Sequence, residues 1–379
     1  MAIEAGADSS GDRRLEINAM RAALALARRG LGAVWPNPSV GCVIVNDGRV
    51  VGRGWTQPGG RPHGETEALR RAGEAARGAV AHVSLEPCCH WGQTPPCVDA
   101  LIAAGVRRVV VALEDPDPRV AGEGLRRLRA AGLDVEVGLC TEEAAEVNAG
   151  FLSRLRLGRP LVTFKLATSL DGRIAVATGE SQWITGPPAR DRAHALRASH
   201  DAIMVGTGTV VADDPQLTCR LPGLGHRSPV RVVIDRHLRI SPASRIIADA
   251  PRVPTWVLTL RSADPGRRAM FLANRVTLID VDDDAEGQID LAAALGVLGE
   301  RGITRLLVEG GARLAAAFFR ARLVDRLVWV HAPLVIGGDG IPAIAGFDLA
   351  ALADGRAFER LSTETIGDDV LTTFRVRPI

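Results

Sequence analysis

The sequence lacks any apolar run approaching the roughly 20 residues that a helix needs to cross a membrane, so no membrane partner is expected. It also lacks a charge surplus, because 46 basic residues face 44 acidic ones and the formal net charge is +2. Nucleic-acid-binding proteins usually carry a basic excess, and no nucleic-acid partner is expected here. The first twelve residues do not have the basic-then-apolar order of a signal peptide, and we expect a frayed tail there.

Cysteine is scarce and unevenly placed. Cys88, Cys89 and Cys97 gather in one short stretch, whereas the other three cysteines are scattered at positions 42, 140 and 219. This distribution suits a reducing compartment better than a disulfide framework, so we expect a cytoplasmic protein.

Lysine is scarcer still, because Lys165 is the only one among the 46 lysine and arginine residues. A lone lysine inside an apolar strand suggests a position that arginine does not fit, since an ammonium is compact and a guanidinium is a broad plane. The alternative is the chance survival of one surface lysine.

At 379 residues the chain is long enough for two domains, each with its own core. Strand patterns alternate with helix patterns in both halves, and residues 157–160 resemble a linker between domains at 13–150 and 160–379. We therefore predict an α/β protein whose first domain has three α/β/α layers. Within it, Asp47-Gly48 predicts a hairpin turn, and residues 13–29 and 141–155 predict helices. In the second domain, residues 187–198 predict a further helix.

One motif in the first domain carries chemistry. His63-Gly64-Glu65 is followed downstream by Pro87-Cys88 and then by Cys97. This pattern is typical of zinc deaminases, in which one imidazole and two thiolates hold the metal and a glutamate moves protons. We expect His63 and Glu65 in the first turn of a helix, and Pro87 at the start of another helix that presents Cys88. A purely structural zinc site, closed by Cys89 or His90, is the alternative, but it gives Glu65 no role.

The eight residues between Cys88 and Cys97 are more specific. Their sequence, Cys-His-Trp-Gly-Gln-Thr-Pro-Pro, resembles the deaminase half of the bifunctional deaminase–reductase family of bacterial riboflavin biosynthesis. The resemblance implies a cytidine-deaminase-like domain and a substrate contact at Asn37, although a turn asparagine bonded to its own backbone is equally compatible with that position. This chain departs from the family pattern at Gly64, Gln93 and Asp117, where alanine, arginine and asparagine are usual.

Two glycine motifs in the second domain suggest anion sites. Gly206-Thr207-Gly208 is a weak signal, because a turn after a strand explains it equally well. Residues 308–314 are stronger, since a buried strand runs through Gly310-Gly311 into a helix start, where free backbone amides can bind an anion. A tight turn without a ligand remains the alternative.

The second domain also resembles that family, through residues 165–173, 181–185, 212–220 and 309–311. The resemblance implies a dihydrofolate-reductase-like α/β domain that uses NADPH. The implied cofactor contacts are Ala167, Trp183, Thr209, Asp213, Arg236, Gly311, Ala312, Arg313, Leu314, Ala315, Ala316 and Ala317. The implied contacts to the phosphorylated substrate are Ser181, Arg197, Leu217, Arg220 and Glu309. Arg197 and Arg220 suit a phosphate because guanidinium binds it in two-point fashion.

Together these features predict two activities. Zn²⁺ on His63, Cys88 and Cys97, with Glu65 as acid and base, would deaminate diaminohydroxyphosphoribosylaminopyrimidine. NADPH would then reduce the ribosyl group to ribityl, with Lys165 steadying the oxygen charge that builds as hydride arrives. We also expect a homo-oligomer. The rival functions are a nucleoside or tRNA deaminase with an appended nucleotide-binding domain, and a second half that only senses a nucleotide.

Overall fold

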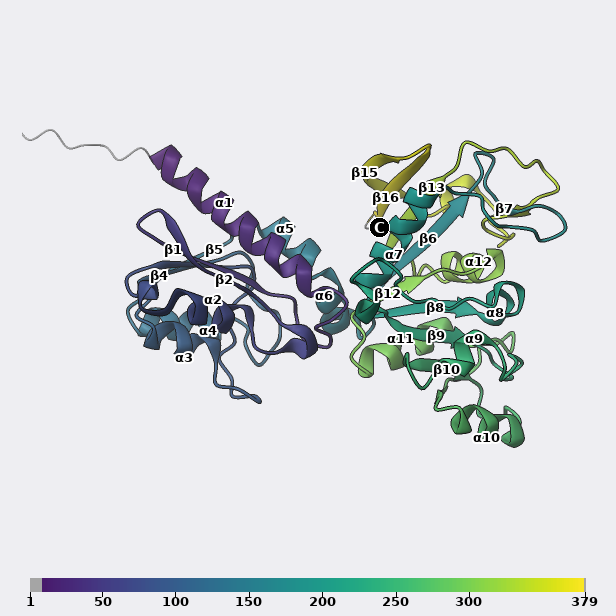
Figure 1. The fold of residues 1–379 in the computed structure, drawn as a ribbon, viewed down its shortest axis with the longest axis horizontal. Coiled ribbons are helices and arrows are strands. Elements are labelled where there is room, and N and C mark those ends of the chain that lie inside the picture. Colours follow the sequence, from purple (N-terminus) through teal and green to yellow (C-terminus); the bar gives the residue numbers. More distant parts are fainter. Residues whose placement is uncertain (1–8, 378–379) are drawn as a thin grey trace, which may run out of the picture. The chain divides into compact units, whose positions relative to one another are not determined.

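The computed structural model describes residues 9–377, with side chains described from residue 13. It divides between Leu157 and Gly158 into two compact units, which are described separately (Figure 1). The helix expected from Arg13 begins at Ser9, and residues 1–8 of the expected tail lie outside the described part. No helix among residues 9–377 is both long and apolar enough to span a membrane.

The first unit is built on one five-stranded sheet in the order β2-β1-β3-β4-β5. Its strands are β1 (Gly41–Asn46), β2 (Arg49–Trp55), β3 (Val80–Val83), β4 (Arg108–Val111) and β5 (Asp134–Val137). β1 runs antiparallel to β2 and β3, while β3, β4 and β5 are parallel. The predicted hairpin is confirmed, because Asp47 and Gly48 join β1 to β2 with φ angles of 47° and 71°.

Helices cover both faces of this sheet, which confirms the three-layer prediction. α1 (Ser9–Ala27) and α5 (Thr141–Val147) lie on one face, and α2 (Gly64–Ala72), α3 (Cys97–Ala103) and α4 (Glu123–Ala130) lie on the other (Figure 1). The side chains of β1 alternate between the two cores: Val43 packs with Met20 and Leu24 of α1. Cys42 and Ile44 face the opposite core, which is shared with α2, α3 and α4.

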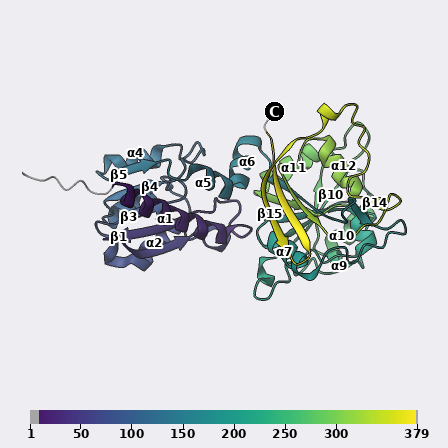
Figure 2. The same cartoon turned by 90° about the horizontal axis from the view of Figure 1, so that it is seen from above.

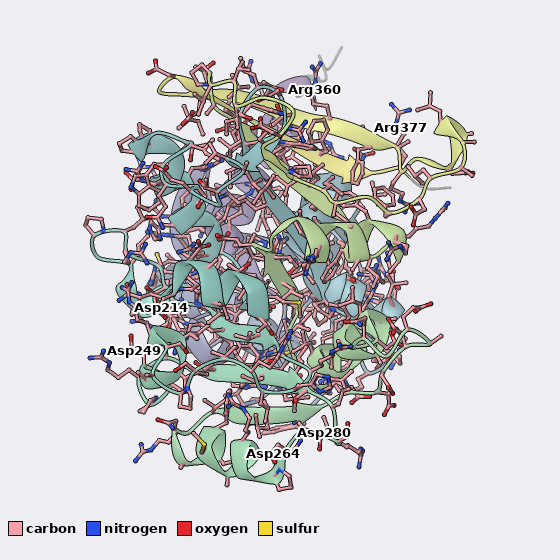
Figure 3. All side chains as sticks on the ribbon, turned by 90° about the vertical axis from the view of Figure 1, so that its right-hand side faces the viewer. Asp214, Asp249, Asp264, Asp280, Arg360 and Arg377 are labelled. Carbon is pink, nitrogen blue, oxygen red and sulfur yellow. The ribbon has the colours of Figure 1, made fainter. Side chains whose placement is uncertain are left out.

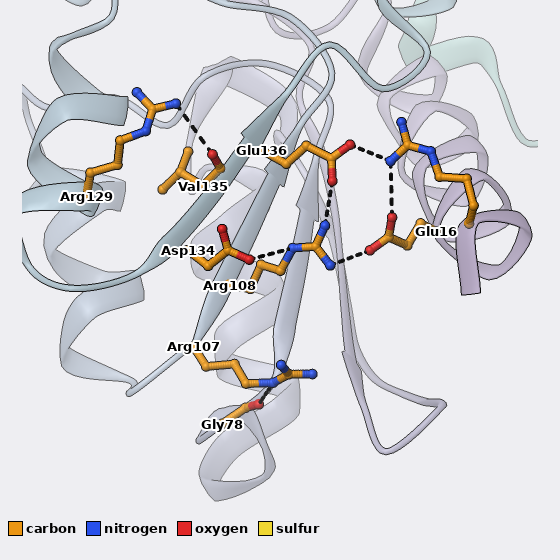
Figure 4. A network of polar contacts seen from close by, with 9 residues as sticks. Glu16, Gly78, Arg107, Arg108, Arg129, Asp134, Val135 and Glu136 are labelled. Atoms are coloured by element: carbon orange, nitrogen blue, oxygen red, sulfur yellow. Dashed lines mark hydrogen bonds and ion pairs between the residues drawn. The ribbon is translucent and has the colours of Figure 1, made fainter. Parts of the chain in front are cut away.

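An ion-pair network joins α1 to the sheet (Figure 4). Arg108 of β4 contacts Glu16 of α1 at 2.6 Å, Glu136 of β5 at 2.5 Å and Asp134 at 3.0 Å. Arg13 also pairs with both Glu16 and Glu136. Single exposed ion pairs contribute little, but a shared guanidinium fixes the position of the helix on the strands.

Two predicted helices differ in the structure. The helix expected at Pro87 is wrong: residues 84–96 contain no helix, and α3 begins only at Cys97. Pro87, Pro95 and Pro96 lack backbone donors, so this stretch follows an irregular path. The helix predicted over 141–155 is divided at Asn148 into α5 and α6 (Ala149–Leu157), and the Asn148 side chain instead accepts a hydrogen bond from the Ser39 amide at 2.9 Å.

The second unit contains a nine-stranded sheet in the order β11-β10-β9-β8-β12-β6-β13-β16-β15. Its strands are β6 (Leu161–Thr168), β8 (Ala202–Gly206), β9 (Val230–Ile234), β10 (Thr255–Thr259), β11 (Thr277–Asp280), β12 (Arg305–Val308), β13 (Arg326–His331), β15 (Phe358–Ile366) and β16 (Asp369–Val376). The first seven strands of this order, from β11 through β10, β9, β8, β12 and β6 to β13, run parallel to one another. The β15–β16 hairpin adds an antiparallel edge beside β13 (Figure 2). β7 (Arg173–Ala175) and β14 (Ile341–Pro342) pair apart from this sheet.

The helices of this unit are α7 (Pro187–Ala198), α8 (Thr207–Asp213), α9 (Arg245–Ala248), α10 (Pro265–Ala273), α11 (Leu291–Glu300) and α12 (Ala312–Arg320). The central strand β6 has two different faces. Phe164 packs against Phe318 and Phe319 of α12, with ring centroids 5.8 and 6.0 Å apart. Lys165 and Ala167 point the other way, into a cavity.

Candidate active sites

The first unit brings together one nitrogen and two sulfurs. His63 is the N-cap residue of α2, Cys88 lies in the irregular stretch after β3, and Cys97 is the first residue of α3. The His63 Nδ1 lies 3.5 Å from the Cys88 Sγ and 3.3 Å from the Cys97 Sγ, and all three ligand atoms fall within 4.8 Å of one another. Two tetrahedral zinc ligands at ordinary bond lengths lie about 3.5 Å apart, so this donor set fits zinc.

The local backbone favours a thiolate at Cys88. The amide of Cys97, at the start of α3, donates to the Cys88 Sγ at 3.3 Å. Hydrogen bonding from Cys97 and from His63, acting against burial, lowers the pKa of the Cys88 thiol to about 4. A deprotonated sulfur is the form that binds metal.

Glu65 lies beside these atoms in the first turn of α2. Its side chain is buried, with the residue only 2% exposed, and its Oε2 has no hydrogen-bond partner among the described residues. Burial raises the pKa of the Glu65 carboxyl to about 7, although the charge of His63 opposes the shift. A carboxyl with a pKa near neutrality can both accept and return a proton.

A cavity of about 530 Å³ opens onto this cluster, and Asn37, His63, Glu65 and Cys88 line it. The Asn37 side-chain nitrogen donates to the Val34 carbonyl at 3.3 Å, so Asn37 has a turn contact as well as a place in the cavity wall. Within residues 13–377 the metal-ligand cluster contains no fourth side chain, and the Cys89 Sγ instead contacts the Arg119 carbonyl at 3.6 Å. The arrangement therefore resembles an open catalytic site more than a closed structural one.

Sequence reasoning missed Glu86 and Arg119, which both line this cavity. The Glu86 carboxylate accepts from the amides of Asp115, Gly122 and Leu125, and so fixes the loop after β4. Within that loop, both carboxylate oxygens of Asp117 hold the Arg119 guanidinium. The sequence signal that could have identified Glu86 was its position directly before the Pro87-Cys88 part of the zinc motif. Gln93 and Asp117, two of the departures from the family pattern, both line the cavity.

The second unit contains a separate cavity of about 680 Å³. It gathers most of the residues that the sequence suggested for the cofactor and substrate. Those in its wall are Lys165, Ala167, Ser181, Trp183, Arg197, Thr209, Asp213, Leu217, Arg220 and Glu309. Gln182, Arg190, His194 and Arg245 also line it and were missed, although the spacing of Arg190, His194 and Arg197 on the predicted helix at 187–198 placed them on one face.

Arg197 and Glu309 form the central charge pair of this cavity. The Arg197 Nε and Nη2 donate to the two Glu309 oxygens at 2.9 and 2.8 Å, and Nη1 donates to the Thr218 carbonyl at 3.1 Å. Burial would raise the pKa of the Glu309 carboxyl, but Arg197 outweighs it and lowers the value to about 2. The Arg197 guanidinium is thus largely occupied by protein acceptors.

Lys165 lies in the field of this pair. Burial lowers the pKa of the Lys165 ammonium, Glu309 opposes the shift, and Arg197 adds to it. The Lys165 side chain lines the cavity and makes no hydrogen bond to the residues that the structure describes. Its ammonium is therefore available to a ligand.

The glycine turn after β12 lies at the N-terminus of α12. A Cβ on Gly310 would come within 2.6 Å of Leu314, and one on Gly311 would lie 3.9 Å from the Thr209 hydroxyl of α8. The starts of α8 and α12 are thus neighbours. Residues 311–317 do not line the cavity itself, and the side chains of Ala315 and Ala316 are buried, so any ligand contact there must use the backbone of the first turn.

Arg236 also lies outside the cavity wall, where its Nη1 donates to the Gly287 carbonyl at 2.5 Å.

Two sequence-family profiles match the chain. The cytidine and deoxycytidylate deaminase zinc-binding region matches residues 14–113, and the RibD C-terminal domain matches residues 160–372. The chain is 46% identical to the riboflavin biosynthesis protein RibD of Escherichia coli (strain K12) over 364 residues, which cover 93% of this chain and 96% of that protein. It is 40% identical to RibD of Bacillus amyloliquefaciens over 355 residues, covering 93% and 94%.

Solved structures agree along nearly the whole chain. Acinetobacter baumannii RibD in its form 1 matches with a TM-score of 0.87 and 37% identity, over 97% of this chain and 100% of that one. A Thermotoga maritima diaminohydroxyphosphoribosylaminopyrimidine deaminase / 5-amino-6-(5-phosphoribosylamino)uracil reductase matches with a TM-score of 0.84 and 33% identity, also over 97% and 100%.

The two cavities and the two profiles define a zinc-dependent deaminase joined to a reductase in one polypeptide. The chain belongs to the RibD family of riboflavin biosynthesis. It is a bifunctional enzyme of that pathway, as the resemblance implied, and a nucleoside or tRNA deaminase with an appended binding domain is not favoured. Zinc and a nicotinamide cofactor suit its two domains.

Proposed function

We propose that the first unit deaminates diaminohydroxyphosphoribosylaminopyrimidine, with His63, Cys88 and Cys97 as zinc ligands. A zinc ion with three protein ligands supplies Lewis-acid chemistry and lowers the pKa of water towards neutrality. Glu65 takes one proton from the attacking water and delivers it to the ring nitrogen. It then moves the remaining proton, from the hydroxyl of the adduct, to the amino group, so that the carbonyl forms, the C–N bond breaks and ammonia leaves. The observation that carries the proposal is the buried, unpartnered Glu65 oxygen beside the ligand cluster.

In the second unit NADPH is the proposed hydride donor, and the ribosyl group of the deaminated product is reduced to ribityl. Lys165 would hydrogen-bond the sugar oxygen and stabilise the negative charge that develops on it. Support for this role comes from the Lys165 ammonium, which lines the cavity without a hydrogen-bond partner among the described residues and lies in the field of Glu309. Glu309 itself is a proposed substrate contact. Ser181, Leu217 and Arg220 are the other proposed substrate contacts.

The proposed cofactor contacts fall into two groups. Ala167, Trp183, Thr209 and Asp213 would meet the dinucleotide from the cavity wall. The backbone at residues 311–317 would bind its diphosphate at the start of α12, and Arg236 would act from outside the wall.

The test uses the purified full chain with the diaminopyrimidine substrate, measuring ammonia release and NADPH oxidation separately. Ammonia should appear without NADPH, and NADPH oxidation should require the deaminated product. Ammonia release without any subsequent NADPH oxidation would contradict the reductase assignment and favour a nucleotide-sensing second unit. Absence of ammonia would contradict the deaminase assignment.

We further propose that the enzyme is a cytoplasmic homo-oligomer. All six cysteines are free in the structure, which suits a reducing compartment. Analytical ultracentrifugation tests the association, and a monomer at micromolar concentration would contradict it.

A further inference from the structure

Three arginines in the wall of the reductase cavity have no carboxylate partner on their guanidinium groups, and two of them, Arg220 and Arg245, make only long polar contacts. Arg220 lies in the loop after α8, Arg245 is the first residue of α9, and both side chains line the cavity. Their guanidiniums reach only the Thr218 hydroxyl at 3.5 Å and the Asp214 carbonyl at 3.4 Å, both long contacts.

The other arginines of this wall are engaged. Arg197 is held by Glu309, and Arg190 donates to the Thr185 carbonyl at 2.9 Å while lying 4.5 Å from the centre of the Trp183 ring. Among the described residues of this wall, Arg220 and Arg245 are therefore the arginines whose guanidiniums have neither a carboxylate partner nor a hydrogen bond shorter than 3.4 Å.

Both residues are positioned through their backbones. The Arg245 amide donates to the Asp214 Oδ1 at 2.8 Å, and Asp214 is labelled at the edge of this unit in Figure 3. The Arg220 amide lies 3.4 Å from the His194 Nδ1. The guanidiniums remain free to turn towards a ligand. Burial, followed by the positive charges of Arg197 and Arg245, lowers the pKa of Arg220, so the two guanidiniums lie within electrostatic reach of each other. Two positive guanidiniums close to each other repel, and an anion bound between them would be attracted to both.

We propose that Arg245 acts with Arg220 to bind a phosphate monoester in this cavity. A guanidinium presents paired donors that match phosphate oxygens, and two of them can hold one phosphate from two sides. The inference rests on the proposed reductase function, whose reactants offer two such groups: the phosphate on the substrate sugar and the 2′-phosphate of NADPH.

The experiment compares the full-length Arg245→Ala variant with wild type and with Arg252→Ala. Arg252 is a matched control, because it lies seven residues further on, pairs with Asp249 and does not line the cavity. Steady-state reduction is measured with the deaminated substrate carrying or lacking its phosphate, and dissociation constants are measured for NADPH and NADH by fluorescence. Loss of a charged hydrogen bond should weaken binding of the relevant phosphate on the order of tenfold, with kcat changed less than twofold.

The two arms identify the phosphate. A KM that rises only for the phosphorylated substrate assigns Arg245 to the substrate, whereas weaker binding of NADPH but not NADH assigns it to the cofactor. If all of these constants stay within twofold of the Arg252→Ala values, the proposal is overturned.

A calorimetric titration with inorganic phosphate separates this inference from the proposed function. If wild type shows no reductase activity, the proposed function fails by itself. Weaker phosphate binding by Arg245→Ala would still support the inference, and equal binding would overturn it. Arg245→Gln, which keeps the length of the side chain, serves as the second variant if the alanine variant melts at a lower temperature than wild type.

Discussion

Arg197 and Glu309 lie 112 residues apart in the sequence, yet their side chains meet through two hydrogen bonds of 2.9 and 2.8 Å. Both side chains are largely buried, at 12% and 13% exposure, and the pair joins α7 to the end of β12 in the reductase cavity. The pair fixes where the cavity's charges lie, because Lys165 and Arg220 both experience the field of these two groups.

Glu309→Gln should destabilise the second unit, because it leaves the Arg197 charge without its partner. A broken buried ion pair costs about 3 kcal/mol, so thermal melting should reveal the loss clearly. Glu364→Gln is the control, since it breaks only the exposed contact with Arg192. Equal melting temperatures for the two variants would contradict a structural contribution from the pair.

The same ion pair should make the free energy of unfolding depend on pH. The folded-state pKa of Glu309 is lowered to about 2, below its ordinary value, so the ionised form stabilises the fold above the unfolded-state pKa. This contribution should be lost as pH falls from about 4.5 towards 2. Urea unfolding of wild type and Glu309→Gln across that range should give curves that converge at low pH. A constant difference between them would show that the carboxylate is not the cause.

Glu65→Gln should keep zinc and fold while abolishing ammonia release, because an amide cannot move the proton. Loss of general acid–base catalysis costs at least about 100-fold in rate. Glu67→Gln is the matched control: it lies in the same helical turn, but its carboxylate pairs with Arg70 and Arg71. Near-normal ammonia release by Glu65→Gln would remove Glu65 from the mechanism.

Cys88→Ser and Cys97→Ser should both lose zinc, since each removes one of the three ligand atoms in the cluster. Cys89→Ser should retain it, because the Cys89 Sγ contacts a backbone carbonyl outside the cluster. Metal content by mass spectrometry after dialysis distinguishes the variants. Zinc loss from Cys89→Ser would instead support a closed, four-ligand structural site.

Much of the fold followed from local patterns. The helix predicted at Pro187–Ala198 matches α7 at both ends, and Asp47-Gly48 forms the predicted hairpin turn. The β15–β16 hairpin was missed because Phe358–Ile366 is mostly polar and exposed, and its pairing depends on β13 more than on its own sequence. The Cys88 segment was mistaken for a helix because Pro87 is compatible with a helix start, whereas Pro95 and Pro96 further along keep the stretch irregular.

The charge pairing of the cavities was also beyond local reasoning. Nothing near Arg197 in the sequence indicated that Glu309 would occupy its guanidinium, or that Arg220 and Arg245 would be left without such a partner. The motifs identified which residue types surround each cavity. The long-range contacts determine which of them are free to bind a ligand.

The most direct test of two complementary sites in one chain is complementation between Glu65→Gln and Lys165→Arg. With the diaminopyrimidine and NADPH, Glu65→Gln alone should release no ammonia, and Lys165→Arg alone should release ammonia while oxidising little NADPH. A mixture of the two variants should form the reduced ribityl product, because each supplies the step that the other lacks. If Lys165→Arg alone oxidises NADPH at the wild-type rate, or if the mixture yields no reduced product although each variant is folded, the account is contradicted.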